Sequence, residues 1–130
     1  MASKMKLSVK ATSDLDEMAN NLDLRRNVVC RIAIGVSLCD RTPPDLDDSD
    51  YGGLEFNKPT IVGTDEQVLM ALLTQHFNKK IDAEDFFSTY IRAEIIRGLS
   101  IMVSDYHKIN SPVEYMEKLV GVTGEEQLDL

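Results

Sequence analysis

The N-terminal stretch Lys4-Met-Lys-Leu-Ser-Val-Lys10 alternates polar and apolar residues without a break. Because successive side chains of an extended strand point to opposite faces, the alternation predicts a short strand over residues 4–10. One face of this strand would pack on the core, and the other would form a basic outer surface. The inward set is Met5, Leu7 and Val9, and the outward set is Lys4, Lys6, Ser8 and Lys10.

Two helices are expected to follow the strand. Thr12 or Ser13 can cap a first helix over residues 13–22, and a second helix is expected over residues 25–39 until a Pro-Pro pair ends it. The order strand, short helix, longer helix is that of ribbon-helix-helix proteins, in which a β-ribbon made by two chains enters the DNA major groove. An ordinary edge strand that lysines protect from aggregation is the alternative interpretation.

The remainder of the chain is predicted to be mostly helical. The expected elements are an acidic loop at 42–54, an extended segment at 55–62 that Pro59 restricts to an edge, helices at 65–79, 83–107 and 111–120, and a frayed tail at 121–130. Two of these helices are apolar on more than one face. Such helices need more burial than a small monomer provides, so we expect a homo-oligomer.

The length of 130 residues predicts a single domain of mostly α class. We divide it into a strand-helix-helix segment at 1–41, the acidic loop and extended segment at 42–62, the helices at 63–120 and the tail at 121–130. No window reaches the roughly 18 apolar residues of a membrane span, and no secretory signal follows the N-terminal lysines. The two cysteines form no CxxC motif, which excludes a zinc ribbon or a disulfide scaffold. We therefore expect a cytoplasmic protein.

Charge is unevenly distributed along the chain. The 14 basic and 22 acidic residues give a formal net charge of −8, which excludes a general basic coat for nucleic acid. Residues 1–39 nevertheless carry +2, whereas residues 40–57 carry −5 and residues 99–130 carry −4. Any contact with nucleic acid is therefore expected to be local, at the basic N-terminal end.

The sequence offers little evidence for a metal site. Cys30 and Cys39 lie nine residues apart in one predicted helix, and His76 and His107 have no carboxylate or cysteine at ligand spacing. Structural or surface roles are the better interpretation of all four residues. The acidic run beginning at Asp45 fails as an EF-hand, because the positions that need glycine and glutamate hold aspartate and phenylalanine.

The sequence also lacks the motifs of an enzyme. There is no GxSxG, P-loop or HExxH motif and no paired catalytic cysteine and histidine. Arg92 and Arg97 lie among apolar residues of a predicted helix. We expect them to form ion pairs with Glu94 or the acidic loop in an oligomer, and phosphate binding is the functional alternative.

Several blocks of sequence resemble the DndE family, the small subunit of the bacterial DNA phosphorothioation system. The resemblance runs from about Lys6 to about Met102, and the chain departs from the family in its acidity and in the unmatched segment 103–130. It also carries Asp23 in a turn where the family tends to have glycine. The matching blocks are Asn27-Val-Val-Cys-Arg-Ile-Ala33, Ser37-Leu38, Gly53-Leu-Glu-Phe-Asn-Lys58, Ala71-Leu-Leu73, Arg92-Ala93 and Arg97-Gly98.

The resemblance implies a helical, DNA-associated accessory protein that has no cofactor of its own. It further implies a compact tetramer that binds nicked duplex DNA through surface lysines. A cysteine desulfurase, the iron-sulfur protein DndC and the ATPase DndD work in the same system. We therefore expect a non-catalytic subunit that contacts nicked or duplex DNA without strong sequence preference. The acidic loop 45–55 and the tail would meet DndC or DndD.

DNA contact is expected from basic residues near the N-terminus. The candidates are Lys4, Lys6, Lys10, Arg25 and Arg26, with Arg31 a weaker candidate because it lies within a helix. Such residues position phosphates and do not read bases. Two other functions stay open at this point. One is a ribbon-helix-helix transcriptional regulator that reads bases from the strand, and the other is an assembly scaffold that never touches DNA.

Overall fold

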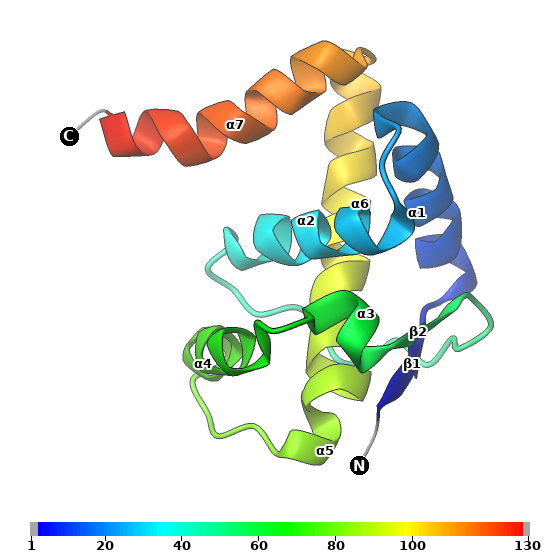
Figure 1. Ribbon diagram of the computed structural model, residues 1–130, viewed down its shortest axis with the longest axis vertical. Helices are drawn as coiled ribbons and strands as arrows, with labels where there is room; N and C mark the ends of the chain where they lie inside the picture. The colour runs from blue at the N-terminus through cyan, green and yellow to red at the C-terminus, as the bar shows by residue number, and fades with distance from the viewer. Residues whose placement is uncertain (1–2, 129–130) are drawn as a thin grey trace.

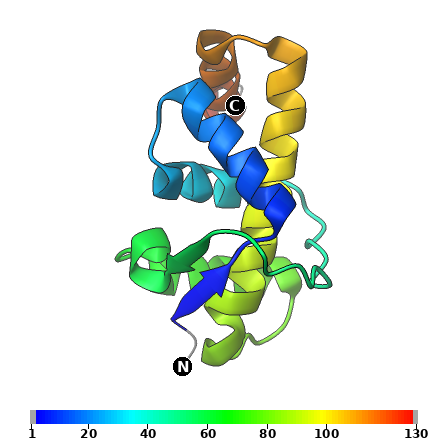
Figure 2. The ribbon, with the colours of Figure 1, turned by 90° about the vertical axis from the view of Figure 1, so that its right-hand side faces the viewer.

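The computed structural model describes the backbone of residues 3–128 and the side chains of residues 3–121. It is mostly helical with a short two-stranded sheet, as the sequence predicts. Figures 1 and 2 show α6 as a long central helix, with the sheet beside its first half and α1 and α2 beside its second half. The elements are β1 (Lys4–Lys6), α1 (Val9–Leu22), α2 (Arg26–Leu38), β2 (Glu55–Asn57), α3 (Lys58–Val62), α4 (Glu66–Phe77), α5 (Ala83–Asp85), the π-helical turn η1 (Phe86–Ile91), α6 (Arg92–Ile109) and α7 (Pro112–Leu128).

The two strands of the sheet come from the same chain. β1 and β2 are antiparallel, and Met5 lies opposite Phe56. Both side chains are buried, whereas the flanking Lys4 and Lys6 are exposed, as the alternation predicts. A ribbon-helix-helix protein would instead pair β1 with the same strand of a second chain. That arrangement stays a prediction.

The predicted boundary between the first strand and the first helix is wrong. β1 has three residues, and α1 starts at Val9, well before the predicted start of the helix. Ser8 caps α1, because its Oγ accepts a hydrogen bond from the N–H of Ala11 at 2.9 Å. Val9, which was expected in the core, is therefore 59% exposed. The cap bond favours the helix over a longer strand, although the alternation continues to Lys10.

Two later boundaries also differ from the prediction. The segment 55–62 is not extended throughout, because α3 begins directly after β2. Pro59 fits there, since the first turn of a helix does not need its missing N–H. The frayed tail expected from residue 121 is helical as far as Leu128, and residues 125–128 are good helix formers. The last two residues of that tail lie outside the described residues.

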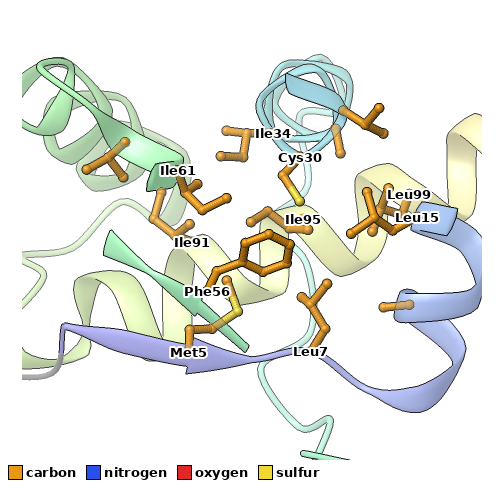
Figure 3. Packing of buried hydrophobic residues seen from close by; sticks show 14 of the residues in the cluster. Met5, Leu7, Leu15, Cys30, Ile34, Phe56, Ile61, Ile91, Ile95 and Leu99 are labelled. Atoms are coloured by element: carbon orange, nitrogen blue, oxygen red, sulfur yellow. The ribbon is translucent and has the colours of Figure 1, made fainter. Parts of the chain in front are cut away.

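The core lies between α6 and the elements packed around it. Figure 3 shows buried side chains from β1, α1, α2, β2 and α3 meeting Ile95 and Leu99 of α6. A close approach of two helices completes this packing. A Cβ atom at Gly98 would lie 1.9 Å from the carbonyl oxygen of Ala33, so α2 and α6 need glycine at their crossing. Within the described residues, no helix is both long enough and apolar enough to span a bilayer.

Candidate nucleic-acid interface

The turn between α1 and α2 places two arginines at the start of a helix. Asp23 ends α1 in the left-handed conformation, with a φ of 53°. Aspartate adopts this conformation more readily than most residues, so it can replace the glycine typical of such a turn. Arg25 is then the N-cap of α2 and Arg26 its first residue, and the Arg25 side chain makes no capping hydrogen bond. The helix therefore offers free N–H groups beside two guanidinium groups.

A hollow of about 680 Å³ opens beside this turn. Arg25 and Arg26 line it together with polar side chains from α1, α2 and α3, and Phe56 of β2 forms an apolar part of its wall. The hollow is not purely basic. Asp16 lies 2.8 Å from Nε of Arg26, and Asp23 also lines the wall. The polar lining residues are Asn20, Asn27 and Thr60.

The two lysines of β1 occupy the exposed face of the sheet. Nζ of Lys4 lies 4.0 Å from Oε2 of Glu55 on β2. Lys6 is exposed, and its side chain makes no ion pair within the described residues. Its backbone carbonyl accepts a hydrogen bond from Nε of Arg92 at 2.6 Å, which fixes the end of the strand.

Lys10 and Arg31 are less available than the sequence suggests. Nζ of Lys10 lies 2.8 Å from Oδ2 of Asp14, one turn along α1. Arg31 donates from Nε to the carbonyl oxygen of Ile61 at 2.8 Å and from Nη2 to that of Thr60 at 3.3 Å. Arg31 therefore ties α2 to α3, and its donors are largely used within the chain.

The six predicted contact residues thus form two groups. Arg25 and Arg26 lie together at the hollow, whereas Lys10 lies near the other end of α1, a helix about 21 Å long by its 14 residues. Lys4 and Lys6 lie on the sheet. Sequence reasoning missed Phe56 and Thr60 as wall residues, because they come from a distant segment that only the fold brings to the turn.

Arg92, for which phosphate binding was the alternative, holds the acidic loop in place. Its guanidinium donates to the carbonyl oxygens of Lys6 at 2.6 Å, Asp48 at 2.8 Å and Asp50. It also stacks 4.3 Å from the ring centre of Tyr51. The residue is only 4% exposed, so these contacts favour the structural interpretation, within one chain.

A second polar cluster joins α2, α4 and α6. Glu94 is fully buried, accepts a hydrogen bond from Oγ of Ser37 at 2.6 Å and lies 2.7 Å from Nδ1 of His76. Arg97 donates from Nε to Oγ of Ser37 at 2.8 Å and lies 3.7 Å from Glu94, the ion-pair partner expected from the sequence. Because the cluster is enclosed, its groups hold helices together and do not form an open site.

The acidic loop between α2 and β2 presents carboxylates that the backbone stabilises. Hydrogen bonds from the N–H groups of Gly52 and Val9 lower the pKa of Asp50 below its usual value of 3.8. Hydrogen bonds from Thr42 likewise lower the pKa of Asp40. Among the described residues, no three His, Cys, Asp or Glu side chains are grouped closely enough to hold a metal ion.

This architecture defines a class of small, mostly helical proteins in which one long helix supports a two-stranded sheet and a basic helix–helix turn. The model of the family described as DNA sulphur modification protein DndE matches residues 4–110. The chain therefore belongs to the DndE family. Helix α7 follows the matched region.

Two crystal structures share this fold at low sequence identity. The structure of DndE from Escherichia coli B7A, described as involved in DNA phosphorothioation modification, has a TM-score of 0.61 and 17% identity over 77% of this chain and 96% of that chain. A DndE mutant with two glycines changed to lysine has a TM-score of 0.63 and 17% identity over 78% of this chain and 97% of that chain. No curated protein matches the sequence.

Proposed function

We propose that this chain is a non-catalytic accessory subunit of DNA phosphorothioate modification that contacts nicked or duplex DNA in the cytoplasm. Membership of the DndE family supports the place in the system. The arrangement of Arg25 and Arg26 beside the free N-terminus of α2 is the observation that carries the DNA contact. A helix N-terminus and two guanidinium groups are suited to phosphate oxygens, and they recognise no base sequence.

The ion pairs at the other basic residues do not prevent DNA contact. Lys4, Lys10 and Arg26 each pair with a carboxylate, and their side chains are 65%, 74% and 54% exposed. Exposed ion pairs contribute only about 0–1 kcal/mol, so a DNA phosphate can replace the carboxylate at little cost. Lys6 and Arg25 need no such exchange. Arg31 contributes least, because it holds α3.

The proposed protein partners are DndC and DndD, met through the acidic loop 45–55 and the C-terminal segment. Arg92 fixes the backbone of this loop, and Asp45 and Asp47 remain exposed on it. A rigid acidic surface favours partners with basic surfaces and resists DNA. Charge reversal at Asp45 and Asp47 is expected to reduce co-purification of DndC or DndD and to leave DNA binding unchanged.

We propose further that the protein works as a homo-oligomer, with a tetramer as the expected form. Helix α4 supports this proposal because it is apolar and yet mostly outside the core. Val68 is 61% and Leu72 is 41% exposed on it, whereas Leu73 is buried. A second copy would cover this face. Sedimentation of the wild type and of Leu72→Lys tests it, and the variant should be smaller.

Binding of three DNA forms tests the DNA contact. Nicked duplex, intact duplex and single-stranded DNA of the same sequence are titrated with the protein at increasing salt. We expect binding to both duplex forms that weakens with salt and does not depend on sequence. Absence of binding at low salt would contradict the DNA contact. A large preference for one operator sequence would instead favour a transcriptional regulator.

A cellular experiment separates the accessory role from a pure scaffold. Lys4, Lys6 and Lys10 are changed together to glutamate, and phosphorothioate in the cellular DNA is measured. Loss of the modification with a folded, expressed variant supports DNA contact by these residues. Full modification would indicate that the protein acts without touching DNA through them.

A further inference from the structure

An apolar groove lies between α2, α6 and α7, far from the basic turn. Its volume is about 560 Å³, and nearly all of its lining is apolar. Figure 1 shows α7 leaving the end of α6 and running beside α2, so the groove follows the space between two helices. Its main apolar lining residues are Ile32, Val36, Ile101, Tyr115 and Met116.

Helix α7 also presents an apolar stripe to the outside of the groove. Val113 is 68%, Met116 is 38% and Val120 is 66% exposed, and these residues recur at the spacing of one helix face. Glu117 borders the stripe, because it lies four residues after Val113. The segment is an addition to the DndE family match, which ends at residue 110.

Gly35 lies in the wall of the groove, in the interior of α2. Glycine in a helix interior costs about 0.5–1 kcal/mol relative to alanine. Packing within the chain does not explain it, because a Cβ atom added at Gly35 would meet nothing within 4 Å. At Gly98, by contrast, the neighbouring helix excludes any side chain. An open glycine on an apolar wall lets another backbone approach α2 closely.

The charge around the groove indicates the sign of the occupant. Helix α7 contains four glutamates and one lysine, Lys118. That lysine lies 3.7 Å from Asp105 of α6, and both residues line the groove. The remaining charge near the groove is negative, with Glu114 and Glu117 exposed on α7. A second copy that inserted its own α7 would bring like charges together, whereas a basic helix would be attracted.

We propose that this groove binds an amphipathic α-helix with basic flanks from another protein, and that this helix crosses α2 at Gly35. Its apolar face would fill the groove, as in helix-in-groove recognition. Its lysines or arginines would face the glutamates of α7. This site is separate from the proposed DNA contact, and either can fail without the other.

The test uses the full chain and synthetic helical peptides. The probe is a fluorescent 18-residue leucine/lysine peptide with one apolar face. A leucine/glutamate peptide with the same apolar face tests the charge, and a leucine/lysine peptide of scrambled order tests the amphipathic pattern. Gly35→Trp fills the groove, and Gly35→Ala is the matched control. Methyl NMR of the wild type locates the peptide on the protein.

We expect the leucine/lysine peptide to bind the wild type and Gly35→Ala alike and Gly35→Trp at least tenfold more weakly. Both other peptides should bind at least tenfold more weakly than this probe. Methyl shifts should concentrate at Ile32, Val36, Ile101 and Met116. Equal binding of the oppositely charged peptides, or methyl shifts elsewhere, would overturn the proposal even if Gly35→Trp fails to fold. Self-association that Gly35→Trp abolishes would assign the groove to a second copy and would also overturn it.

Discussion

Nδ1 of His76 lies 2.7 Å from Oε2 of Glu94, and this contact joins α4 to the central helix α6. The other ring nitrogen of His76, Nε2, lies 2.7 Å from the carbonyl oxygen of Asp40, just after α2. Beyond this, α4 is held by buried Leu73 and by an edge-to-face contact between Phe77 and Tyr90. One imidazole therefore connects three segments of the fold.

Replacing Glu94 should destabilise the protein strongly. Glu94→Ala removes the carboxylate that balances Arg97 and His76, and breaking a buried charge pair typically costs about 3–5 kcal/mol. Glu94→Gln keeps the shape and one acceptor, so its cost should be smaller. Urea unfolding measures both variants, with the exposed Glu114→Ala as a control that should change little. A loss under about 1 kcal/mol for Glu94→Ala would contradict this role of the cluster.

Alanine at the two glycines of the central helices should have opposite effects. At Gly98 the new Cβ atom would lie 1.9 Å from the backbone of Ala33, so the helices must separate. Such overpacking costs about 1–3 kcal/mol or more. At Gly35 the space is open, and alanine should stabilise the protein by about 0.5–1 kcal/mol. Thermal unfolding of both variants measures this, and effects of the same sign would refute the assignment.

The acidic loop should give stability that acid removes. The pKa of Asp50 in the folded state lies below 3.8, because the N–H groups of Gly52 and Val9 bond its ionised carboxylate. This contribution is present above pH 3.8 and is lost as the pH falls through the lower, folded-state pKa. The stability difference between the wild type and Asp50→Asn should therefore shrink below about pH 4. Denaturation at several pH values measures it, and a constant difference would speak against the prediction.

The two thiols should react at very different rates. Cys39 is exposed, whereas Cys30 is buried, and desolvation raises the pKa of Cys30 to about 12. The thiolate is the reactive form, so Cys30 should resist a thiol reagent until the protein unfolds. Titration with a coloured disulfide reagent should show one fast thiol in the native state and two in denaturant. Two fast native thiols would be inconsistent with the packing of α2.

Local patterns predict much of this fold. Helical periodicity places α2 within a residue or two of its ends, and the long apolar stripe predicts one helix from residue 83 to the end of α6. The strand boundary is predicted poorly, because a cap bond at Ser8 and the pairing of β1 with β2 compete over the same residues. Alternation of side chains does not reveal that competition.

The candidate site is less predictable than the fold. The sequence identifies Arg25 and Arg26, but the wall that Thr60 adds depends on how α3 packs beside α2. His76 and Glu94 lie 18 residues apart, so spacing gives no sign of their contact. Pairing also changes the ranking of the basic residues. Arg31 has backbone partners that only the tertiary structure supplies.

The salt dependence of binding to nicked duplex DNA tests the central claim most directly. The wild type, the double variant Arg25→Ala/Arg26→Ala and the control Lys80→Ala, outside the hollow, are compared by fluorescence anisotropy. Each phosphate contact contributes roughly one to the slope of log affinity against log salt concentration. The double variant should therefore bind more weakly with a slope smaller by about 2, and Lys80→Ala should match the wild type. Equal affinity and slope for the double variant and the wild type would contradict a DNA contact at the start of α2.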